Sequence, residues 1–325
     1  MLMKHLMGLG ATAIMLATSI NAAQAAWPEK PITIYCPYSA GGGTDATARF
    51  FAAGLRKEFG VPVNVVNRTG ANGLTGHSAM AKSKPDGYSI GTLGQAIGLY
   101  HWQGMELSYK DITPLVMYNF DPAGFQVGPS KAEFKDAMAV IEDLKANPDK
   151  WTLGAAGRMG SWGMAFTKLA LDFGMVPSKY SWISSGGAAP SLTELAAGGI
   201  DLSPTSLPEA KTLIDAGKIR ALAVMSDKRL PGFPDVPTME EVTGKRIVSG
   251  AWRGIAAPAG LPEDIKAKYV KALRNIWESE DFKKGMEKFG YGLAWMEGEE
   301  FDKFLVENDV NAGIILEATK GEAKK

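Results

Sequence analysis

Short apolar runs alternate with amphipathic segments along most of the chain. Ile32–Cys36, Val63–Asn67 and Tyr88–Leu93 are short and rich in residues that favour strands. Between the first two, Ala46–Phe59 carries apolar residues at helical spacing and stops at Gly60. Strands that alternate with helices predict an α/β fold with a mostly parallel sheet.

The alternation resumes after a break near residue 120. Two apolar runs within 113–127 are separated by residues 119–122, which we interpret as a first crossing between two lobes. Ser130 and Glu133 form a capping-box pattern that predicts the start of a helix ending near Asn147. The pattern then predicts strands at 151–154, 180–183, 200–203 and 221–225 and helices at 164–173, 189–197 and 207–216.

A return crossing is expected near residue 252. Three prolines exclude regular structure from 229–238. Residues 252–258 then predict a strand that returns to the first lobe, and helices are expected at 262–279, 281–289 and 299–319. We therefore expect lobe 1 to comprise 26–120 and 252–325, and lobe 2 to comprise 121–251.

The first residues have the pattern of a secretory signal. Lys4 and His5 precede an apolar run at 6–20, and Ala23-Gln24-Ala25 provides a small-x-small cleavage site. The run is too short to span a bilayer comfortably, although an uncleaved anchor is the alternative reading. The sequence therefore predicts that residues 1–25 are a signal peptide and that the mature protein is exported.

Composition narrows the classes of partner and chemistry. The chain has 35 basic and 35 acidic residues, so no nucleic acid or lipid surface is expected as a partner. Its single cysteine, Cys36, excludes an internal disulfide and is expected to be a buried, inert thiol. The three histidines, His5, His77 and His101, are far apart, so we expect no metal centre, no catalytic dyad and no cofactor.

Two glycine-rich turns carry the candidate chemistry. Pro37–Arg49 joins a strand to a helix through Gly41, Gly42 and Gly43, and Ala155–Gly163 repeats the arrangement in the predicted second lobe. Glycines at such a junction let backbone N–H groups converge at the positive end of a helix, where carboxylates and phosphates bind. The candidate ligand-binding residues of the two turns are Tyr38, Ser39, Gly42, Gly43, Thr44, Asp45, Gly157, Arg158, Gly160, Ser161 and Trp162.

Several candidates have a structural reading beside the ligand reading. Asp45 would repel an anion that it faced, so we favour a role in holding the loop, with its mutation still weakening binding. Arg158 is either a solvated loop cation or a ligand contact, and Ser161 either caps its helix or donates to the ligand. Gln95, Thr205 and Ser206 follow predicted strands, where clefts of open α/β sheets lie, but capping explains Ser206 equally well.

Short motifs follow one another in a specific order along the chain. They are Trp27–Ile32, Pro37–Asp45, Val66–Ala71, Pro85–Tyr88, Ser185–Ala188, Ala197–Asp201, Gly217–Val224, Pro237-Thr238 and Trp252–Gly254. In the order of these motifs the chain resembles the TctC/Bug family of periplasmic solute-binding proteins of tripartite tricarboxylate transporters. The resemblance covers essentially all of the mature chain.

The resemblance implies a two-lobed periplasmic-binding-protein fold, type II-like, with a ligand cleft between lobes that close by hinge motion. It implies that a carboxylate is held by backbone N–H groups, hydroxyls and waters from one loop per lobe, here Tyr38–Asp45 and Gly157–Trp162. This chain has Gly163 and Met164 where the family often has an acidic residue or histidine, which leaves the ligand open. Arg158 could pair with a second carboxylate, and Trp162 could cover the ligand body.

We therefore expect a non-catalytic, monomeric receptor that passes a small di- or tricarboxylate, or a related organic acid, to a membrane permease. A sensor that presents its ligand to a membrane kinase is the alternative within the same class. A nucleotide-dependent enzyme is weakly suggested because Gly41–Ala46 fits a relaxed dinucleotide fingerprint, but Val65-Val66-Asn67 provides no acid for a ribose. A serine hydrolase at Ser161 lacks a downstream histidine as its base.

Overall fold

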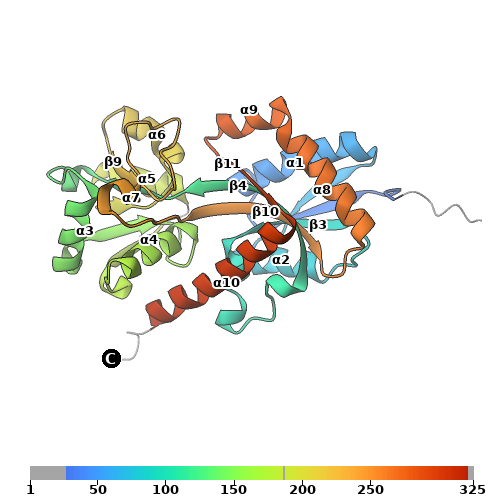
Figure 1. Ribbon diagram of the computed structural model, residues 1–325, viewed down its shortest axis with the longest axis horizontal. Coiled ribbons are helices and arrows are strands. Elements are labelled where there is room, and N and C mark those ends of the chain that lie inside the picture. Colours follow the sequence, from blue (N-terminus) through green and yellow to red (C-terminus); the bar gives the residue numbers. More distant parts are fainter. Residues whose placement is uncertain (1–26, 186, 321–325) are drawn as a thin grey trace, which may run out of the picture.

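The computed structural model describes residues 27–185 and 187–320, which form two α/β lobes joined side by side (Figure 1). The predicted signal peptide lies outside the described residues. Within these residues no helix combines the length and hydropathy that crossing a bilayer requires. Each lobe has one sheet with its own hydrophobic core.

Lobe 1 is built on a six-stranded sheet in the order β11-β4-β10-β3-β1-β2. β1 runs parallel to β2 and β3, whereas β10 and β11 pair antiparallel with β4. Its strands are β1 (Ile32–Cys36), β2 (Val63–Asn67), β3 (Ser89–Gly94), β4 (Ile112–Pro122), β10 (Gly250–Pro258) and β11 (Leu293–Glu297). Its helices are α1 (Gly43–Phe59), α2 (Leu74–Ala81), α8 (Glu263–Glu278), α9 (Glu280–Lys288) and α10 (Gly298–Lys320).

Lobe 2 has a five-stranded sheet in the order β7-β6-β8-β5-β9. β6 is parallel to β7 and β8, and β5 is antiparallel to β8 and β9. Its strands are β5 (Gly124–Val127), β6 (Thr152–Ala155), β7 (Ser181–Ser184), β8 (Leu202–Ser203) and β9 (Arg220–Val224). Its helices are α3 (Ala137–Ala146), α4 (Ser161–Asp172), α5 (Ala188–Ala197), α6 (Leu207–Asp215) and α7 (Met239–Thr243).

Two segments connect the sheets, and they make both sheets mixed. β4 leads through Ala123 into β5, and the chain returns through Ser249 into β10, with the Ala123 N–H donating to the Ser249 carbonyl at 2.9 Å. The expectation of mostly parallel sheets is therefore wrong, because the strands next to the crossings run antiparallel. The first crossing is also later than 119–122, since β4 continues to Pro122.

The start of α3 is a second correction. Ser130 and Glu133 were expected to open this helix, but Pro129–Lys131 is a short 3-10 turn and the Ser130 hydroxyl donates to Asp201 at 2.7 Å. Asp136 is the N-cap residue, and its carboxylate accepts from the Ala139 N–H at 2.9 Å. The tertiary contact of Ser130 removes the hydroxyl that the capping box needs.

α10 spans the two lobes (Figure 1). Its first half packs Phe301 and Leu305 into the lobe 1 core. Its second half packs Ile315 and Leu316 against Met164 of α4, together with Leu99 from the segment after β3. The C-terminal helix therefore buries apolar surface against both lobes.

Candidate functional site

The first glycine-rich loop leaves β1 and enters α1 without a side-chain cap. Gly41 has φ 82°, a conformation that glycine adopts without steric cost, and Gly42 is the N-cap residue. No side chain caps this helix, so the first-turn N–H groups are left to a ligand or to water. Asp45 does not fill that place, because its carboxylate accepts hydrogen bonds from the Gly41 N–H, Arg49 and Asn67 instead.

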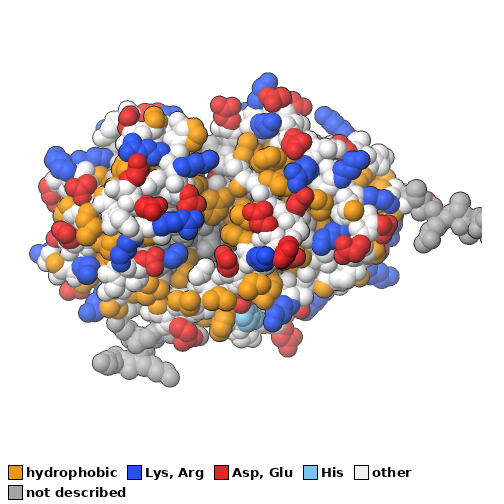
Figure 2. Space-filling model, in the orientation of Figure 1, with side chains coloured by type: hydrophobic (Ala, Val, Ile, Leu, Met, Phe, Trp, Pro, Cys, Tyr) orange, Lys and Arg blue, Asp and Glu red, His pale blue; other side chains and the backbone are white. Residues whose placement is uncertain are grey.

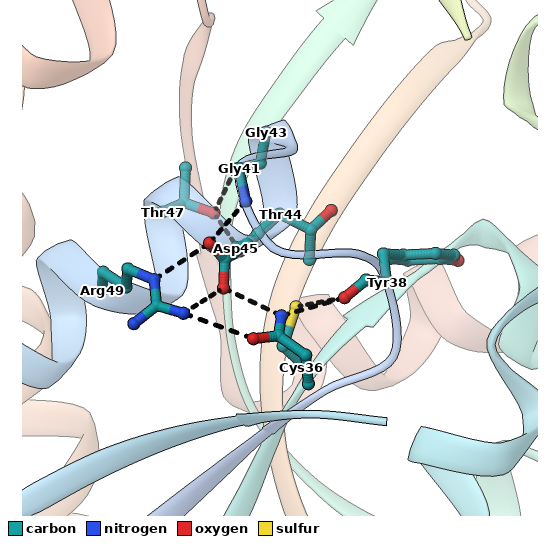
Figure 3. A network of polar contacts seen from close by, with 9 residues as sticks. Cys36, Tyr38, Gly41, Gly43, Thr44, Asp45, Thr47 and Arg49 are labelled. Carbon is teal, nitrogen blue, oxygen red and sulfur yellow. Dashed lines mark hydrogen bonds and ion pairs between the residues drawn. The ribbon is translucent and has the colours of Figure 1, made fainter. Parts of the chain in front are cut away.

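Asp45 holds the loop in shape (Figure 3). Its carboxylate accepts from the Gly41 N–H at 2.9 Å and from Arg49 through both Nε and Nη2, each at 2.9 Å. Asn67, at the end of β2, donates 2.9 Å bonds to Asp45 and to the Tyr38 carbonyl. Arg49 and the Tyr38 ring lie on opposite sides of this carboxylate.

These bonds set the charge state of Asp45. Its side chain is only 3% exposed, and this burial acts to raise the pKa of the carboxyl group. The hydrogen bonds from Arg49, Gly41 and Asn67 outweigh burial and lower that pKa below its ordinary value. Asp45 is therefore an anion at neutral pH, and its carboxylate is hydrogen-bonded by Gly41, Arg49 and Asn67.

Asn67 also argues against the hypothesis that the first loop binds a dinucleotide. Dinucleotide-binding folds place an acid near the end of the second strand to bind the ribose. Here that position holds an amide that bonds the loop itself. The structure thus gives Asn67 a loop-holding role that sequence reasoning missed.

Tyr38 and Gln95 follow β1 and β3, which are neighbouring strands of the lobe 1 sheet. The half-buried ring of Tyr38 meets His77 edge-on, and burial raises the pKa of the Tyr38 hydroxyl to about 12. His77 bonds the Tyr100 hydroxyl at 2.7 Å, and burial lowers its pKa to about 4, so it is neutral at pH 7. Gln95 has a buried side-chain oxygen with no partner among the described residues.

The second loop leaves β6 and enters α4 in a similar way. Gly160 is the N-cap residue without a side-chain cap, and its N–H donates to the Gly157 carbonyl at 2.8 Å. Ser161 is the first helical residue and is half-buried. A Cβ at Gly163 would collide with the Arg158 backbone. Close packing of the loop on α4 therefore explains the glycine that departs from the family pattern.

Two residues of this loop that were expected to contact the ligand, Arg158 and Trp162, have contacts within lobe 2. Arg158 donates through Nη1 to the Pro177 carbonyl at 2.7 Å and through Nη2 to the Tyr180 carbonyl at 2.8 Å. Its guanidinium also lies 5.7 Å from the ring centroid of Trp182. Trp162 is 7% exposed and packs in the lobe 2 core. Their ligand contacts stay predictions, with a structural role already visible for each.

Thr205 and Ser206 are both buried at the junction of β8, β5 and α6. The Thr205 carbonyl accepts from Gln126 Nε2 at 2.7 Å and from the Gly124 N–H at 3.0 Å. Ser206 is the N-cap residue of α6, but its hydroxyl donates to Glu209 at 2.7 Å instead of capping the backbone. The alternative reading of Ser206, that its side chain caps the helix, is therefore wrong, and its ligand contact stays a prediction.

The first loop lies against a polar cluster that sequence reasoning missed. A Cβ at Gly43 would collide with the Tyr291 hydroxyl and would lie 3.1 Å from Arg253 Nη2. Arg253 Nη1 donates to Asp121 at 2.6 Å and to Asn119. The sequence signal for this cluster was a charged residue inside each of two apolar runs, Arg253 in 250–258 and Asp121 in 112–122. Buried charges are rare unless they are paired.

A cleft of about 550 Å³ lies between the lobes, and a hollow between them is visible in Figure 2. Gln95 and Trp252 line it from lobe 1, Lys168 and Arg246 from lobe 2, and Asn308 from α10. Gln95 is the one predicted site residue in this lining. Basic and acidic side chains are interspersed over the visible face, in keeping with a balanced net charge.

The site has the donors for an anion, and within the described residues no group of three potential metal ligands occurs. Cys36 is buried and free, as predicted, and burial raises the pKa of its thiol. The chemistry available at the two loops is hydrogen bonding by backbone N–H groups and hydroxyls.

Comparisons with known proteins match the whole architecture. The model of a family described as "Tripartite tricarboxylate transporter family receptor", TctC, matches residues 47–320. Protein BugT of Bordetella pertussis is 31% identical over 86% of each chain. The crystal structure of a TctC solute-binding protein from Polaromonas has a TM-score of 0.76 and 29% identity, covering 90% of this chain and 99% of that one. An R. palustris protein solved with adipate has a TM-score of 0.75 and 23% identity, covering 90% and 98%.

Proposed function

Because the chain belongs to the TctC family of periplasmic solute-binding proteins, we propose that it captures a small carboxylate and delivers it to the membrane permease of a tripartite transporter. Members of this family are binding proteins, not enzymes, with the two-lobed α/β fold that the sequence predicted. The proposed ligands are di- and tricarboxylates and related organic acids. The receptor works as a monomer.

One observation carries this proposal: each lobe presents a helix start with a glycine at the N-cap and no side-chain cap. Gly42 precedes α1 in lobe 1 and Gly160 precedes α4 in lobe 2. An acid with a carboxylate at each end can accept hydrogen bonds from both starts, and the adipate of the R. palustris relative is such an acid. A ligand that contacts both lobes favours the closed state over the open one.

A thermal-shift screen tests the proposal. The purified protein is unfolded and refolded to release any acid carried over from the cell, then heated with adipate, succinate, malate, citrate, glutamate, benzoate or ATP. A ligand at a hundred times its Kd stabilises the folded state by about 2.7 kcal/mol, which raises the Tm by several degrees for a chain of this length. A shift with ATP and none with any acid would overturn the proposal.

A further inference from the structure

Arg253 is a nearly buried cation at the point where the chain re-enters lobe 1. It follows Trp252 in β10 and its side chain is 14% exposed. Both hydrogen bonds that it donates within the described residues leave from Nη1, to Asp121 Oδ2 at 2.6 Å and to Asn119 Oδ1. Asp121 is 3% exposed, so the two charges form a largely desolvated ion pair.

The acceptors of Arg253 are themselves fixed. Asn119 Nδ2 donates to Asp121 Oδ1 at 3.0 Å and to the Gly292 carbonyl at 2.6 Å. The Gly292 N–H donates to Asp121 Oδ1 at 2.6 Å. Backbone from the segment before β11 and side chains from β4 therefore hold one edge of the guanidinium in a defined orientation.

The other edge of the guanidinium faces the first glycine-rich loop. Nη2 lies 3.1 Å from the position that a Cβ on Gly43 would occupy, next to the uncapped start of α1. The Tyr291 ring covers the guanidinium at 4.7 Å from its centroid. The positive charge also reaches Tyr38, whose hydroxyl pKa is raised by burial and lowered in part by Arg253.

Two other cations of the loops, Arg158 and Arg49, make different contacts. Arg158 directs both terminal nitrogens to backbone carbonyls of lobe 2. Arg49 directs its Nε and Nη2 to the side chains of Asp45 and Asn67. Arg253 differs from both, because its hydrogen bonds within the described residues use only Nη1, and its Nη2 lies near Gly43.

We infer that Arg253 is the cation that binds the ligand's carboxylate at the first loop. Nη2 donates to one carboxylate oxygen, which also accepts from the first N–H groups of α1, while Asp121 and Asn119 hold Nη1 in place. This inference rests on the proposed function and adds a side chain to a site otherwise made of backbone donors and hydroxyls. The sequence suggested a cation only for a second carboxylate, at Arg158, whereas Arg253 supplies a cation for the carboxylate at the first loop.

Removing the charge alone confounds binding with folding, since Arg253→Gln leaves Asp121 buried without its partner. The test therefore uses the pair Arg253→Gln and the double variant Arg253→Gln/Asp121→Asn, in which no unpaired charge remains. Arg229→Gln is the matched control, because Arg229 pairs with Glu241 on the exposed surface of lobe 2. Kd values are measured by calorimetry for the seven compounds of the thermal-shift screen, and stability is measured by urea unfolding.

We expect the double variant to regain most of the stability that Arg253→Gln loses, yet to bind every acid about ten- to hundred-fold more weakly than the parent. Arg229→Gln should bind within about two-fold of the parent. If the parent binds an acid and the double variant binds it equally well, Arg253 is structural and this inference is overturned, while the proposed function stands. If the parent binds none of the acids, the proposed function falls and this inference falls with it.

Discussion

At the scale of single residues, charged and polar side chains around the first loop are mostly used to hold backbone. Asp45 accepts hydrogen bonds from Gly41, Arg49 and Asn67, and Thr47 donates to the carbonyls of Gly43 or Thr44 while its oxygen lies 2.7 Å from the Tyr118 hydroxyl. These bonds connect the loop and the start of α1 to β2 through Asn67 and to β4 through Tyr118. We expect the ligand on the exposed side of the loop.

Asp45 gives a pH-dependent prediction. Its pKa in the folded protein lies below the ordinary value near 3.8, so its stabilisation is complete above that value and is lost as the pH falls from there through the lower pKa of the folded protein. Asp45→Asn places an NH₂ group against donors and should cost about 2 kcal/mol of unfolding free energy at pH 7. The difference from the parent should shrink towards pH 3.

Urea unfolding between pH 3 and pH 7 measures this difference. Asp302→Asn, on the exposed side of α10, is the control and should change stability by less than about 0.5 kcal/mol at each pH. An Asp45→Asn effect that is equally large at pH 3 and pH 7 would contradict a role for the ionised carboxylate.

At the scale of elements, the helix starts depend on what packs against them. Gly43 is the first residue of α1, and the Tyr291 hydroxyl and Arg253 leave no room for a side chain there. α4 likewise accommodates the Arg158 backbone through the missing side chain of Gly163. In both loops glycine allows a close approach of other parts of the protein, in addition to its conformational freedom.

Gly43→Val tests this packing. The added side chain must displace the Tyr291 hydroxyl and approach Arg253, so carboxylate binding should weaken by about ten-fold or more. The fold should lose only about 1–2 kcal/mol, because the Tyr291 side chain can move. Calorimetric titration with the best acid of the screen and urea unfolding measure the two effects.

Gly232→Ala is the control for this variant, since a Cβ there meets open space. It should leave both binding and stability unchanged within about 0.5 kcal/mol. Binding by Gly43→Val at the affinity of the parent would show that the ligand does not approach the start of α1.

At the scale of the whole molecule, the lobes are joined by two strand crossings and by α10. The Arg253–Asp121 pair lies beside the crossings, and Met159 of the second loop packs in the small cluster that contains Ile315 and Leu316 of α10. Both loops are thus in contact with the elements that join the lobes. We expect closure about these elements to bring the two helix starts towards one ligand.

Small-angle X-ray scattering tests closure directly. A saturating acid identified by the thermal screen should lower the radius of gyration from its ligand-free value, which is about 20 Å for a compact chain of this length. Benzoate, with one carboxylate, should lower it less than an acid with a carboxylate at each end, because it reaches one helix start. An unchanged radius with bound dicarboxylate would contradict a closing hinge.

Local patterns in the sequence were sufficient for most elements. β1 and β2 have the predicted bounds, and α1 ends at Gly60 as predicted; Gly60 and Gly198 end their helices in the left-handed conformation. These features follow from periodicity and from glycine at the helix C-terminus, which are short-range effects. The order of the motifs identified the family, and the two-lobed fold is confirmed by its structural relatives.

Contacts between distant residues decided the rest. β11 and α7 were not predicted, and Ser130 lost its capping role to Asp201, 71 positions away. Arg158 and Arg253 look alike as cations in the sequence, yet carbonyls of lobe 2 engage one and Asp121, 132 positions away, orients the other. By itself the sequence determined the elements and the family, because these depend on local pattern; the tertiary structure decided which cation faces the first loop, because that depends on partners brought together only by folding.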